Sequence, residues 1–485
     1  MKKFAMIFTI TFLAVGLLFS SISPTKHANA LLLKSTVGLL DSTLDSLFKN
    51  TNGPVQVIVT FNSENGVQEH QLELLRKAGI TTGLTFEALP FAGVLATKSQ
   101  VEALLKNEEV LSVYHNAPIK YENEAATDIT GVNKVRTDDT FRKLNGGLPV
   151  SGKGIGVVIN DSGVDGTHKD IEFGRNLVQN VFGSANLNAI SGLLPITYIE
   201  NVPNTDSDSG HGTHVAGTVG GTGAMSGGKY EGVAPGAKLI GYGSGAVVAM
   251  LDTLGGFEYA LTHQQEYNIR IITNSWGATS DAGTAFDPKH PINIATKRLY
   301  DRGIITVFSA GNSGPNESTI SGNYKKAPWV VTVAAGDKQG NLANFSSRGL
   351  KGYGGTIEID GVSYNWADKP TITAPGVDII STRVLSPLSA LSATKDVEYI
   401  SPEHLPYYTT FSGTSMAAPH VAGVIALLLE VNPNLNSFEV KDILERTATK
   451  MDGYESWEVG AGYVNAYKAV ELAFSYHDKK KNNRR

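Results

Sequence analysis

Three short stretches of this chain place a chemically active side chain among small residues. They are NDSGVD (160–165), GHGTHVAG (210–217) and SGTSMAAPHVAG (412–423). A serine hydroxyl is a weak nucleophile at neutral pH, so it needs an imidazole to take its proton and a carboxylate to hold that imidazole in the right tautomer. The surrounding glycines let a substrate backbone approach closely. One residue of each type therefore predicts acyl transfer through a serine, provided that the fold brings the three together.

The third stretch predicts a buried helix that begins near Ser415. The first N–H groups of a helix have no intrahelical acceptor and carry the positive end of its dipole, so they favour an oxyanion on the attacked carbonyl group. Pro419 is expected in the first turn, where a missing N–H costs little. The apolar residues 421–429 would anchor the helix in the core and hold the hydroxyl rigidly.

From about residue 130 onward, apolar strand-like runs alternate with helical or glycine-rich segments. This alternation predicts an α/β fold with a mainly parallel sheet covered by helices on both faces. In such sheets the chemistry usually lies at the carboxyl ends of the strands. Asp161 ends the strand-like run GIGVVIND, and this position favours it as the carboxylate over Asp165 and Asp170.

The three stretches resemble the aspartate, histidine and serine motifs of the subtilisin-like serine proteases, in the same chain order. Weaker similarity extends from about residue 130 to 473. The resemblance implies that Asp161, His211 and Ser415 form the catalytic triad. It also implies endopeptidase cleavage of proteins and peptides through an acyl-enzyme on Ser415.

SAGNSG (309–314) resembles the oxyanion-hole segment of the same family. The resemblance implies that Asn312 donates a side-chain N–H to the oxyanion, whereas GNSG alone would suggest a turn residue. YGSG and NSWG resemble the two strands that bind an extended peptide by main-chain pairing. Segments 275–277 and 309–311 would line the primary specificity pocket, with room for a bulky apolar or aromatic side chain, although Trp276 is equally compatible with the core. The implied substrate-binding residues are Gly243, Ser244, Gly245, Ser275, Trp276, Gly277, Ser309, Ala310 and Gly311.

The chain also departs from the family pattern. Asn160 stands where an aliphatic residue is usual, and Ser162 replaces a commoner threonine. No cofactor is implied for catalysis, and a structural calcium ion cannot be assigned, because the segment GTGAMSGGKYEG after His211 lacks an asparagine-rich calcium loop. Asp206 and Asp208 could contribute to another calcium site, but an acidic surface loop is the simpler interpretation.

Residues 1–30 have the layout of a secretory signal: two lysines, an apolar run and an Ala-Asn-Ala cleavage site, with an uncleaved membrane anchor as the alternative. The sequence therefore predicts an extracellular bacterial protein that has no membrane segment in its mature form. The absence of cysteine means that it uses no disulfides. A net charge of -5 gives no basic face for nucleic acid.

Residues 54–116 switch period in the order β-α-β-β-α-β, which predicts a small ferredoxin-like domain. This part resembles, more weakly, the propeptide of the same proteases, a folding helper that also inhibits the mature enzyme. The polar stretch 120–131 is predicted to be an exposed linker. The expected organisation is a signal peptide (1–30), an inhibitor-like propeptide (31–125), a peptidase domain (126–476) and a basic, solvated tail (477–485). Within the peptidase domain, 349–370 is expected to be an added hairpin and 383–408 a long loop.

Other activities fit the sequence less well. HGTH offers two histidines for zinc, but their i, i+3 spacing and the lack of a glutamate differ from the H-E-x-x-H pattern of metalloproteases. An esterase of the α/β-hydrolase kind would need G-x-S-x-G, and GTSMA does not supply it. An inactive relative that only binds peptides or wall polymers is a further alternative, although all four catalytic positions hold competent residues.

Overall fold

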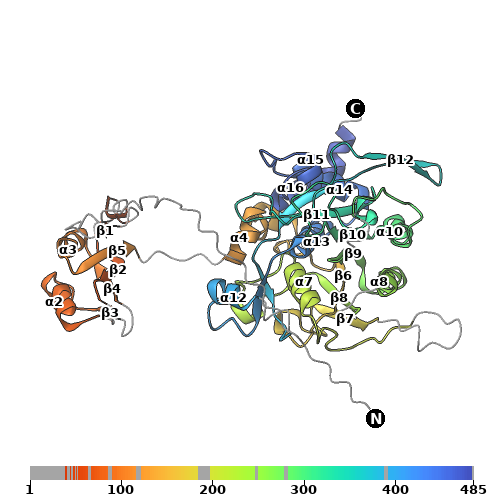
Figure 1. Ribbon diagram of the computed structural model, residues 1–485. Coiled ribbons are helices and arrows are strands. Elements are labelled where there is room, and N and C mark those ends of the chain that lie inside the picture. The colour runs from red at the N-terminus through yellow and green to blue at the C-terminus, as the bar shows by residue number, and fades with distance from the viewer. Residues whose placement is uncertain are drawn as a thin grey trace, which may run out of the picture. The chain divides into compact units, whose positions relative to one another are not determined.

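The computed structural model describes residues 39–482 except 41–43, 45–46, 50, 52, 64–66, 86–89, 116–121, 184–196, 246–249, 278–281 and 387–391. The predicted signal peptide, residues 1–30, lies outside the described residues. The chain divides into two compact units, Met1–Ile119 and Lys120–Arg485. Each is described by itself (Figure 1).

The first unit is a five-stranded sheet in the order β1-β5-β2-β4-β3. Leaving aside the short β1, its elements follow the predicted order β-α-β-β-α-β, and the strands from β5 to β3 pair antiparallel. This confirms the ferredoxin-like pattern. The elements are β1 (Leu39–Leu40), β2 (Val55–Phe61), α2 (Glu69–Lys77), β3 (Gly83–Thr85), β4 (Phe91–Ala96), α3 (Lys98–Leu104) and β5 (Val110–His115).

The segment 120–131 is not the exposed linker that its polar composition suggested. It contains helix α4 (Glu122–Ile129), and Ala126 is buried in the core of the second unit. The Thr130 hydroxyl caps the end of this helix by donating to the Ala126 carbonyl (3.2 Å), and its backbone carbonyl accepts from Ala466 N (2.7 Å). A few small apolar residues among polar ones were enough to bury one face of a short helix.

The second unit is built around a seven-stranded sheet, order β14-β11-β10-β9-β6-β8-β7, in which every neighbouring pair is parallel. This confirms the predicted α/β class. The strands are β6 (Gly156–Asp161), β7 (Leu177–Phe182), β8 (Lys238–Gly243), β9 (Ile269–Asn274), β10 (Ile305–Ser309), β11 (Val330–Gly336) and β14 (Ile372–Pro375).

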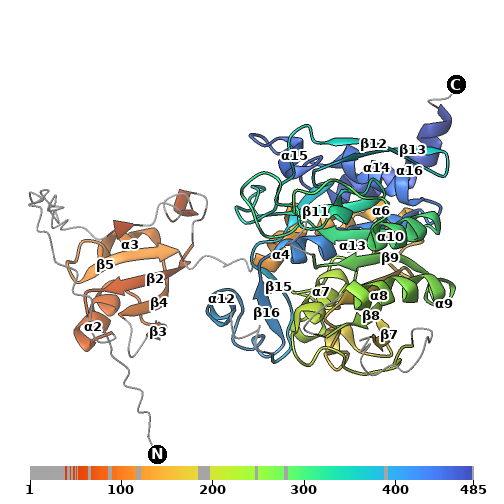
Figure 2. The ribbon, with the colours of Figure 1, turned by 45° about the vertical axis from the view of Figure 1, so that its right-hand side comes forward.

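Helices cover both faces of this sheet (Figure 2). Successive strand residues alternate between two cores: Val157 and Ile159 pack with α7, α13, α14 and α16, whereas Val158 packs with α8 and α10. The helices are α5 (Val132–Thr137), α6 (Asp139–Leu144), α7 (His211–Gly220), α8 (Met250–Thr262), α9 (Gln264–Tyr267), α10 (Pro291–Asp301), α13 (Thr414–Val431), α14 (Ser437–Thr447), α15 (Ser456–Val459) and α16 (Ala466–Asn482).

The two insertions take different forms. Residues 349–370 contain the predicted hairpin, β12 (Gly354–Ile359) paired antiparallel with β13 (Val362–Ala367). The segment 383–408 is not only a loop, because it contains helix α12 (Ala393–Tyr399) and is framed by the antiparallel pair β15 (Ile379–Thr382) and β16 (Tyr408–Phe411). At the C-terminus, α16 continues the backbone through Asn482, so most of the expected tail is helical.

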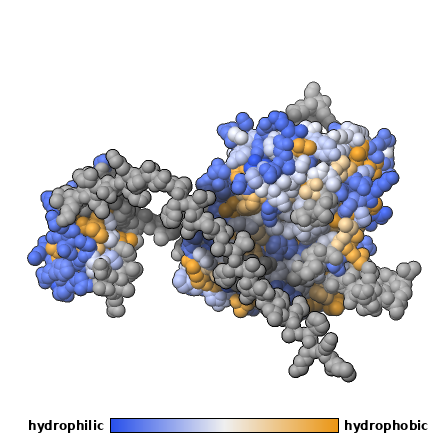
Figure 3. All heavy atoms as spheres, in the orientation of Figure 1, coloured by the Kyte–Doolittle hydropathy of each residue, from blue (hydrophilic) through white to orange (hydrophobic). Residues whose placement is uncertain are grey.

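Helix α13 is long and apolar enough to cross a membrane, but 83% of its apolar window is buried inside the second unit, as in the core helix of a globular domain. On the face seen in Figure 3, hydrophobic residues are dispersed among hydrophilic ones. Scattered exposed apolar residues are normal on protein surfaces. The burial of α13 matters for the site, because it fixes the position of Ser415.

Candidate active site

A carboxylate and an imidazole meet where β6 ends and α7 begins. His211 Nδ1 lies 2.6 Å from Asp161 Oδ1. The Asp161 side chain is 4% exposed and the His211 side chain 25% exposed, so the ring has one edge towards solvent. Asp161 Oδ1 also accepts from Ser162 N (2.8 Å). The carboxylate can therefore hold the imidazole with Nδ1 protonated and leave Nε2 to act as a base.

The start of α7 is held by a second carboxylate, Asp206. It accepts from Gly210 N (2.8 Å), Thr213 N (3.0 Å) and Thr213 Oγ1 (2.6 Å), which satisfies N–H groups at the helix start. The Ser162 hydroxyl donates to Asp206 (3.1 Å) and accepts from Gly212 N (2.9 Å). The unusual Ser162 thus links the end of β6 to the helix that carries His211, and both Asp206 oxygens serve this network.

The electrostatic environment of His211 stabilises its imidazolium form. Burial by itself would lower the pKa of His211, but the charge and hydrogen bond of Asp161, with a further contribution from the charge of Asp206, raise the pKa above its ordinary value of 6.5. Burial raises the pKa of Asp206. His211 is therefore poised to accept a proton and to stabilise the resulting imidazolium ion.

Glycine allows the two elements to approach this closely. Gly163 has a φ of +140° and touches the Thr205 backbone, and Gly212 lies against the Gly163 carbonyl group, so a Cβ at either position would clash with backbone atoms. A larger residue at 163 or 212 would move His211 away from Asp161.

Ser415 lies in the first turn of α13 and forms two hydrogen bonds with Ser275, the residue after β9. The Ser415 hydroxyl donates to the Ser275 carbonyl (3.1 Å), and the Ser275 hydroxyl donates to the Ser415 carbonyl (2.8 Å). In this resting arrangement the hydroxyl is not hydrogen-bonded to His211. Such bonds in serine hydrolases often form only when the substrate is bound.

Pro419 lies in the second turn of α13, not in the first as expected, because the helix begins at Thr414. A proline at this position removes the N–H that would bond to the Ser415 carbonyl four residues earlier. Ser275 Oγ supplies the missing donor. The proline is tolerated because a hydroxyl from the neighbouring strand end replaces the helical hydrogen bond.

This replacement can be tested by a double-mutant cycle in a Ser415→Ala background, which prevents autolysis and keeps the residue 415 carbonyl. Ser275→Ala should lower the free energy of unfolding by about 1 kcal/mol, because it removes that carbonyl's donor. With Pro419→Ala also present, the backbone N–H gained at this position can bond to the carbonyl, and Ser275→Ala should have little effect. Unfolding in guanidinium chloride measures the effect of Ser275→Ala with and without Pro419→Ala. An equal loss of unfolding free energy in both cases would show that Ser275 Oγ does not replace the helical hydrogen bond.

Asn312 lies beside the start of α13. Its Oδ1 accepts from Thr414 N (2.9 Å) and Thr414 Oγ1 (3.0 Å), and Thr414 Oγ1 accepts from Gly311 N (3.0 Å). Because Oδ1 is held by Thr414, the amide Nδ2 is turned to the other side, and a Cβ on Gly413 would lie 3.3 Å from it. An N–H donor is thus held next to the helix turn that carries Ser415.

These groups gather at the carboxyl edge of the parallel sheet. Asp161 is the last residue of β6, and Ser275 and Asn312 follow the adjacent strands β9 and β10. Trp276 Nε1 donates to the Asn160 carbonyl (2.8 Å). Asn160 Nδ2 donates to Asn274 Oδ1 (2.9 Å), so the unusual asparagine links β6 to β9 beneath the site.

The predicted substrate-binding residues lie at the same edge. The Trp276 ring packs against Phe257, Phe308 and Tyr324, as its core alternative suggested. Ser244 N and Gly245 N already donate to the Asp161 and Ser162 carbonyls (3.0 and 3.1 Å), so these two donors are not available to a peptide. Ala310 N donates to Val333 O (2.9 Å), and Gly277 is exposed beside Ser275.

The other candidate residues of the same motifs, Asp165, Asp170 and His214, have hydrogen-bond partners outside the His211–Asp161 pair. Asp165 accepts from Thr167, and the buried Asp170 accepts from Met225 N (2.9 Å) and Tyr408 OH (2.7 Å). His214 Nε2 contacts the Ile379 and Thr409 carbonyls (2.9 and 3.2 Å), and burial lowers the pKa of His214 to about 3. Its Nε2 faces two carbonyl groups rather than His211, which does not fit a zinc site built from HGTH.

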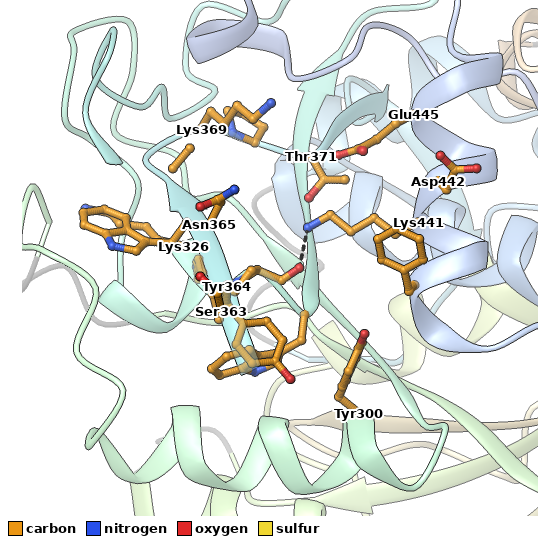
Figure 4. Close-up of a pocket in the computed structure, with 18 of the residues that line it drawn as sticks. Tyr300, Lys326, Ser363, Tyr364, Asn365, Lys369, Thr371, Lys441, Asp442 and Glu445 are labelled. Atoms are coloured by element: carbon orange, nitrogen blue, oxygen red, sulfur yellow. Dashed lines mark hydrogen bonds between the residues drawn. The ribbon is translucent and has the colours of Figure 1, made fainter. Parts of the chain in front are cut away.

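One cavity lies away from these groups, between hairpin strand β13 and helix α14 (Figure 4). Its volume is about 680 Å³, and Lys441 there donates to the Pro328 and Val330 carbonyls (3.0 Å each). The described residues that line it include none of Asp161, His211 and Ser415. This cavity is therefore not part of the candidate active site.

The carboxyl edge of one parallel sheet thus holds a hydrogen-bonded carboxylate–imidazole pair at the end of β6, and a serine at a helix start that is hydrogen-bonded to the residue after β9. These are the groups that a serine hydrolase uses. The sequence matches the Peptidase_S8 model, described as the subtilase family, over residues 152–464. It is 32% identical over 393 residues to "Serine protease AprX" of Bacillus subtilis, covering 77% of each chain. It is 28% identical to "Thermostable alkaline protease" of Halalkalibacterium halodurans, covering 80% of this chain and 84% of the relative. The solved structure of "Sphericase" matches with a TM-score of 0.51 and 26% identity, over 69% of this chain and 97% of that one. The chain belongs to the subtilase family, and it is a serine endopeptidase.

Sequence reasoning missed two supporting roles. Asp206 was noted only as a possible calcium ligand, although its place five residues before His211 also suits a helix cap. The sequence motif indicates only a substrate-binding role for Ser275 and does not show its hydrogen bonds with Ser415. The proline four residues after Ser415 was the signal for that bond, because it implies an unpaired carbonyl.

Proposed function

We propose that Ser415, His211 and Asp161 are the catalytic triad of this endopeptidase. His211 Nε2 takes the proton of Ser415 Oγ as that oxygen bonds to the substrate carbonyl carbon. The imidazolium ion then gives the proton to the departing amine, which leaves an acyl-enzyme on Ser415. Water repeats the two proton transfers and releases the acid. The hydrogen bond of 2.6 Å between His211 Nδ1 and Asp161 Oδ1 is the observation that supports this assignment most strongly.

Asn312 Nδ2 and the Ser415 backbone N–H are the proposed oxyanion donors. Both are donors at the start of α13, where the helix dipole favours negative charge. Asn312→Ala should lower kcat by about 10²- to 10³-fold with KM little changed, a range known from a related protease. Steady-state hydrolysis of a chromogenic peptide measures this, with the exposed neighbour Ser313→Ala as control. A fall in kcat no larger than that of the control would exclude Asn312 from the oxyanion hole.

The pH dependence follows from the environment of His211. The base form is the neutral imidazole, and Asp161 and Asp206 keep the ring protonated to higher pH by raising its pKa above 6.5. kcat/KM on an uncharged peptide should therefore rise with pH through a midpoint above 6.5 and stay high on the alkaline side. A profile that peaks well below pH 5 would contradict the role of His211.

We further propose that the protein is exported and that residues 31–125 are its propeptide. The signal-like residues 1–30 and the ferredoxin-like order of the first unit support this. Folding of a large parallel sheet is slow, which gives a physical reason for a detachable folding template. The propeptide would also inhibit the mature enzyme. Intact-mass measurement of the secreted, active protein tests the proposal: the mature chain should begin near residue 125.

The proposed substrates are proteins and peptides in the medium, with no nucleic acid partner and no cofactor in bond cleavage. Purified protein should hydrolyse casein and lose this activity with a serine-directed phosphonyl reagent. Activity that a chelator abolishes and the phosphonyl reagent leaves intact would instead indicate a metalloprotease. A separate loss of thermal stability on chelation would indicate a structural calcium ion. No casein hydrolysis at all would favour an inactive peptide-binding relative.

A further inference from the structure

Polar side chains lie against both segment 275–277 and segment 309–311. Ser321 N donates to the Ala310 carbonyl (3.2 Å), which joins Ser321 to the segment after β10. A Cβ added to Gly277 would lie 2.7 Å from Ser321 Oγ, and a Cβ added to Gly311 would also lie 2.7 Å from it. The Ser321 hydroxyl is therefore within contact of both segments, between them.

A lysine lies next to this hydroxyl. Lys325 Nζ donates to Ser321 Oγ (3.1 Å), and a Cβ on Gly277 would also collide with Lys325 Nζ. Lys325 is 2% exposed, while Gly277 above it is exposed. The ammonium group thus lies directly against the backbone of one segment at Gly277, on the side where a Cβ would project.

The position of this lysine is fixed by the short 3-10 helix Asn323–Lys326. Tyr324 in this turn packs against Trp276 and Phe308, with ring centroids 5.9 and 5.2 Å apart. The Lys325 carbonyl accepts from Thr332 Oγ1 (2.6 Å). These contacts hold the backbone of the turn, and the bond to Ser321 Oγ directs the ammonium group toward the two segments.

We propose that Lys325 makes this protease prefer an acidic side chain, glutamate above all, immediately before the cleaved bond. The inference rests on the proposed role of the two segments in holding that side chain. A carboxylate that reaches Lys325 between the two segments gains a charge-assisted hydrogen bond to a buried ammonium group, where such bonds are strong. An apolar side chain would have to pack against the ammonium and the hydroxyl, and a lysine would be repelled. Glutamate is favoured over aspartate because its longer chain reaches the ammonium group.

The test uses chromogenic tetrapeptides that differ only before the cleaved bond: Glu, Gln, Leu or Lys. For the wild-type protein, kcat/KM should be about tenfold or more higher for Glu than for Gln, since hydrogen bonds to charged groups are stronger by roughly that factor. Lys325→Met should bring the Glu/Gln ratio close to one and raise kcat/KM for Leu. Lys289→Met makes the same change of net charge at an exposed site and should leave the ratio unchanged.

Two results would overturn the proposal while the proposed function stands. One is a wild-type protein that cleaves after Gln or Leu at least as well as after Glu. The other is a Lys325→Met variant that reacts normally with the phosphonyl reagent and keeps the wild-type ratio. If that variant does not fold, the ratio of kcat/KM for the Glu and Gln peptides in the wild-type protein still tests the preference for glutamate. Failure to hydrolyse every peptide and casein as well would overturn the proposed function too.

Discussion

Ser415→Ala should lower kcat by about a millionfold, a factor known for the nucleophile of a related serine protease. The substitution removes the only atom that can form the acyl-enzyme and keeps the Ser415 backbone, whose carbonyl accepts from Ser275. The same variant should accumulate as a chain that still carries residues 31–125, because the propeptide is expected to be removed by the enzyme itself. Peptide hydrolysis and intact-mass measurement check the two effects on one preparation.

The matched control is Ser412→Ala, which removes another hydroxyl just before α13. Ser412 is exposed, and its Oγ contacts Asp378, away from His211. It should retain activity and be processed normally. Normal trimming of the Ser415→Ala chain would indicate that another protease removes the propeptide. Retention of wild-type kcat by that variant would show that Ser415 is not the nucleophile.

Asp161→Asn should reduce kcat/KM by about 10⁴-fold while the fold is preserved. The carboxamide has nearly the same shape as the carboxylate. It no longer stabilises the imidazolium ion, and it favours the tautomer in which Nε2 carries the proton and cannot act as a base. The pKa of His211 should fall as well, because the charge and hydrogen bond of Asp161 are what raise it. Steady-state kinetics and a pH titration of the residual activity measure both consequences.

Asp165→Asn is the comparison for this prediction, since Asp165 was a competing carboxylate in the same motif. Its side chain accepts from Thr167 in the following turn and does not contact His211. A small change in kcat/KM is therefore expected. If Asp165→Asn lowered kcat/KM strongly and Asp161→Asn did not, Asp161 would not be the carboxylate that supports His211 in catalysis.

The sheet and its helices could be predicted because they depend on short-range patterns. Apolar runs of strand length, separated by helices, leave few alternatives to a parallel sheet. In such a sheet the ends of β6, β9 and β10 must meet at one edge, which brings Asp161, Ser275 and Asn312 together.

Other features depend on contacts between distant segments, and the sequence could not show them. The polar stretch 120–131 became helix α4 because the second unit offers a surface for Ala126. Pro419 was expected in the first turn of α13 and lies in the second, four residues after Ser415, which hid the hydrogen bond between Ser275 Oγ and the Ser415 carbonyl. Small residues at 275–277 and 309–311 suggest room for a bulky apolar or aromatic side chain, and no local pattern indicates that Lys325, about fifty residues further along the chain, lies against Gly277.

The most direct test of the triad is to label the protein with a serine-directed phosphonyl fluoride and to locate the adduct by mass spectrometry. A single adduct on Ser415 is expected, formed at a rate that rises with pH through a midpoint above 6.5 and falls to near background in His211→Ala. An adduct on another serine, or labelling of Ser415 at the same rate without His211, would contradict the account.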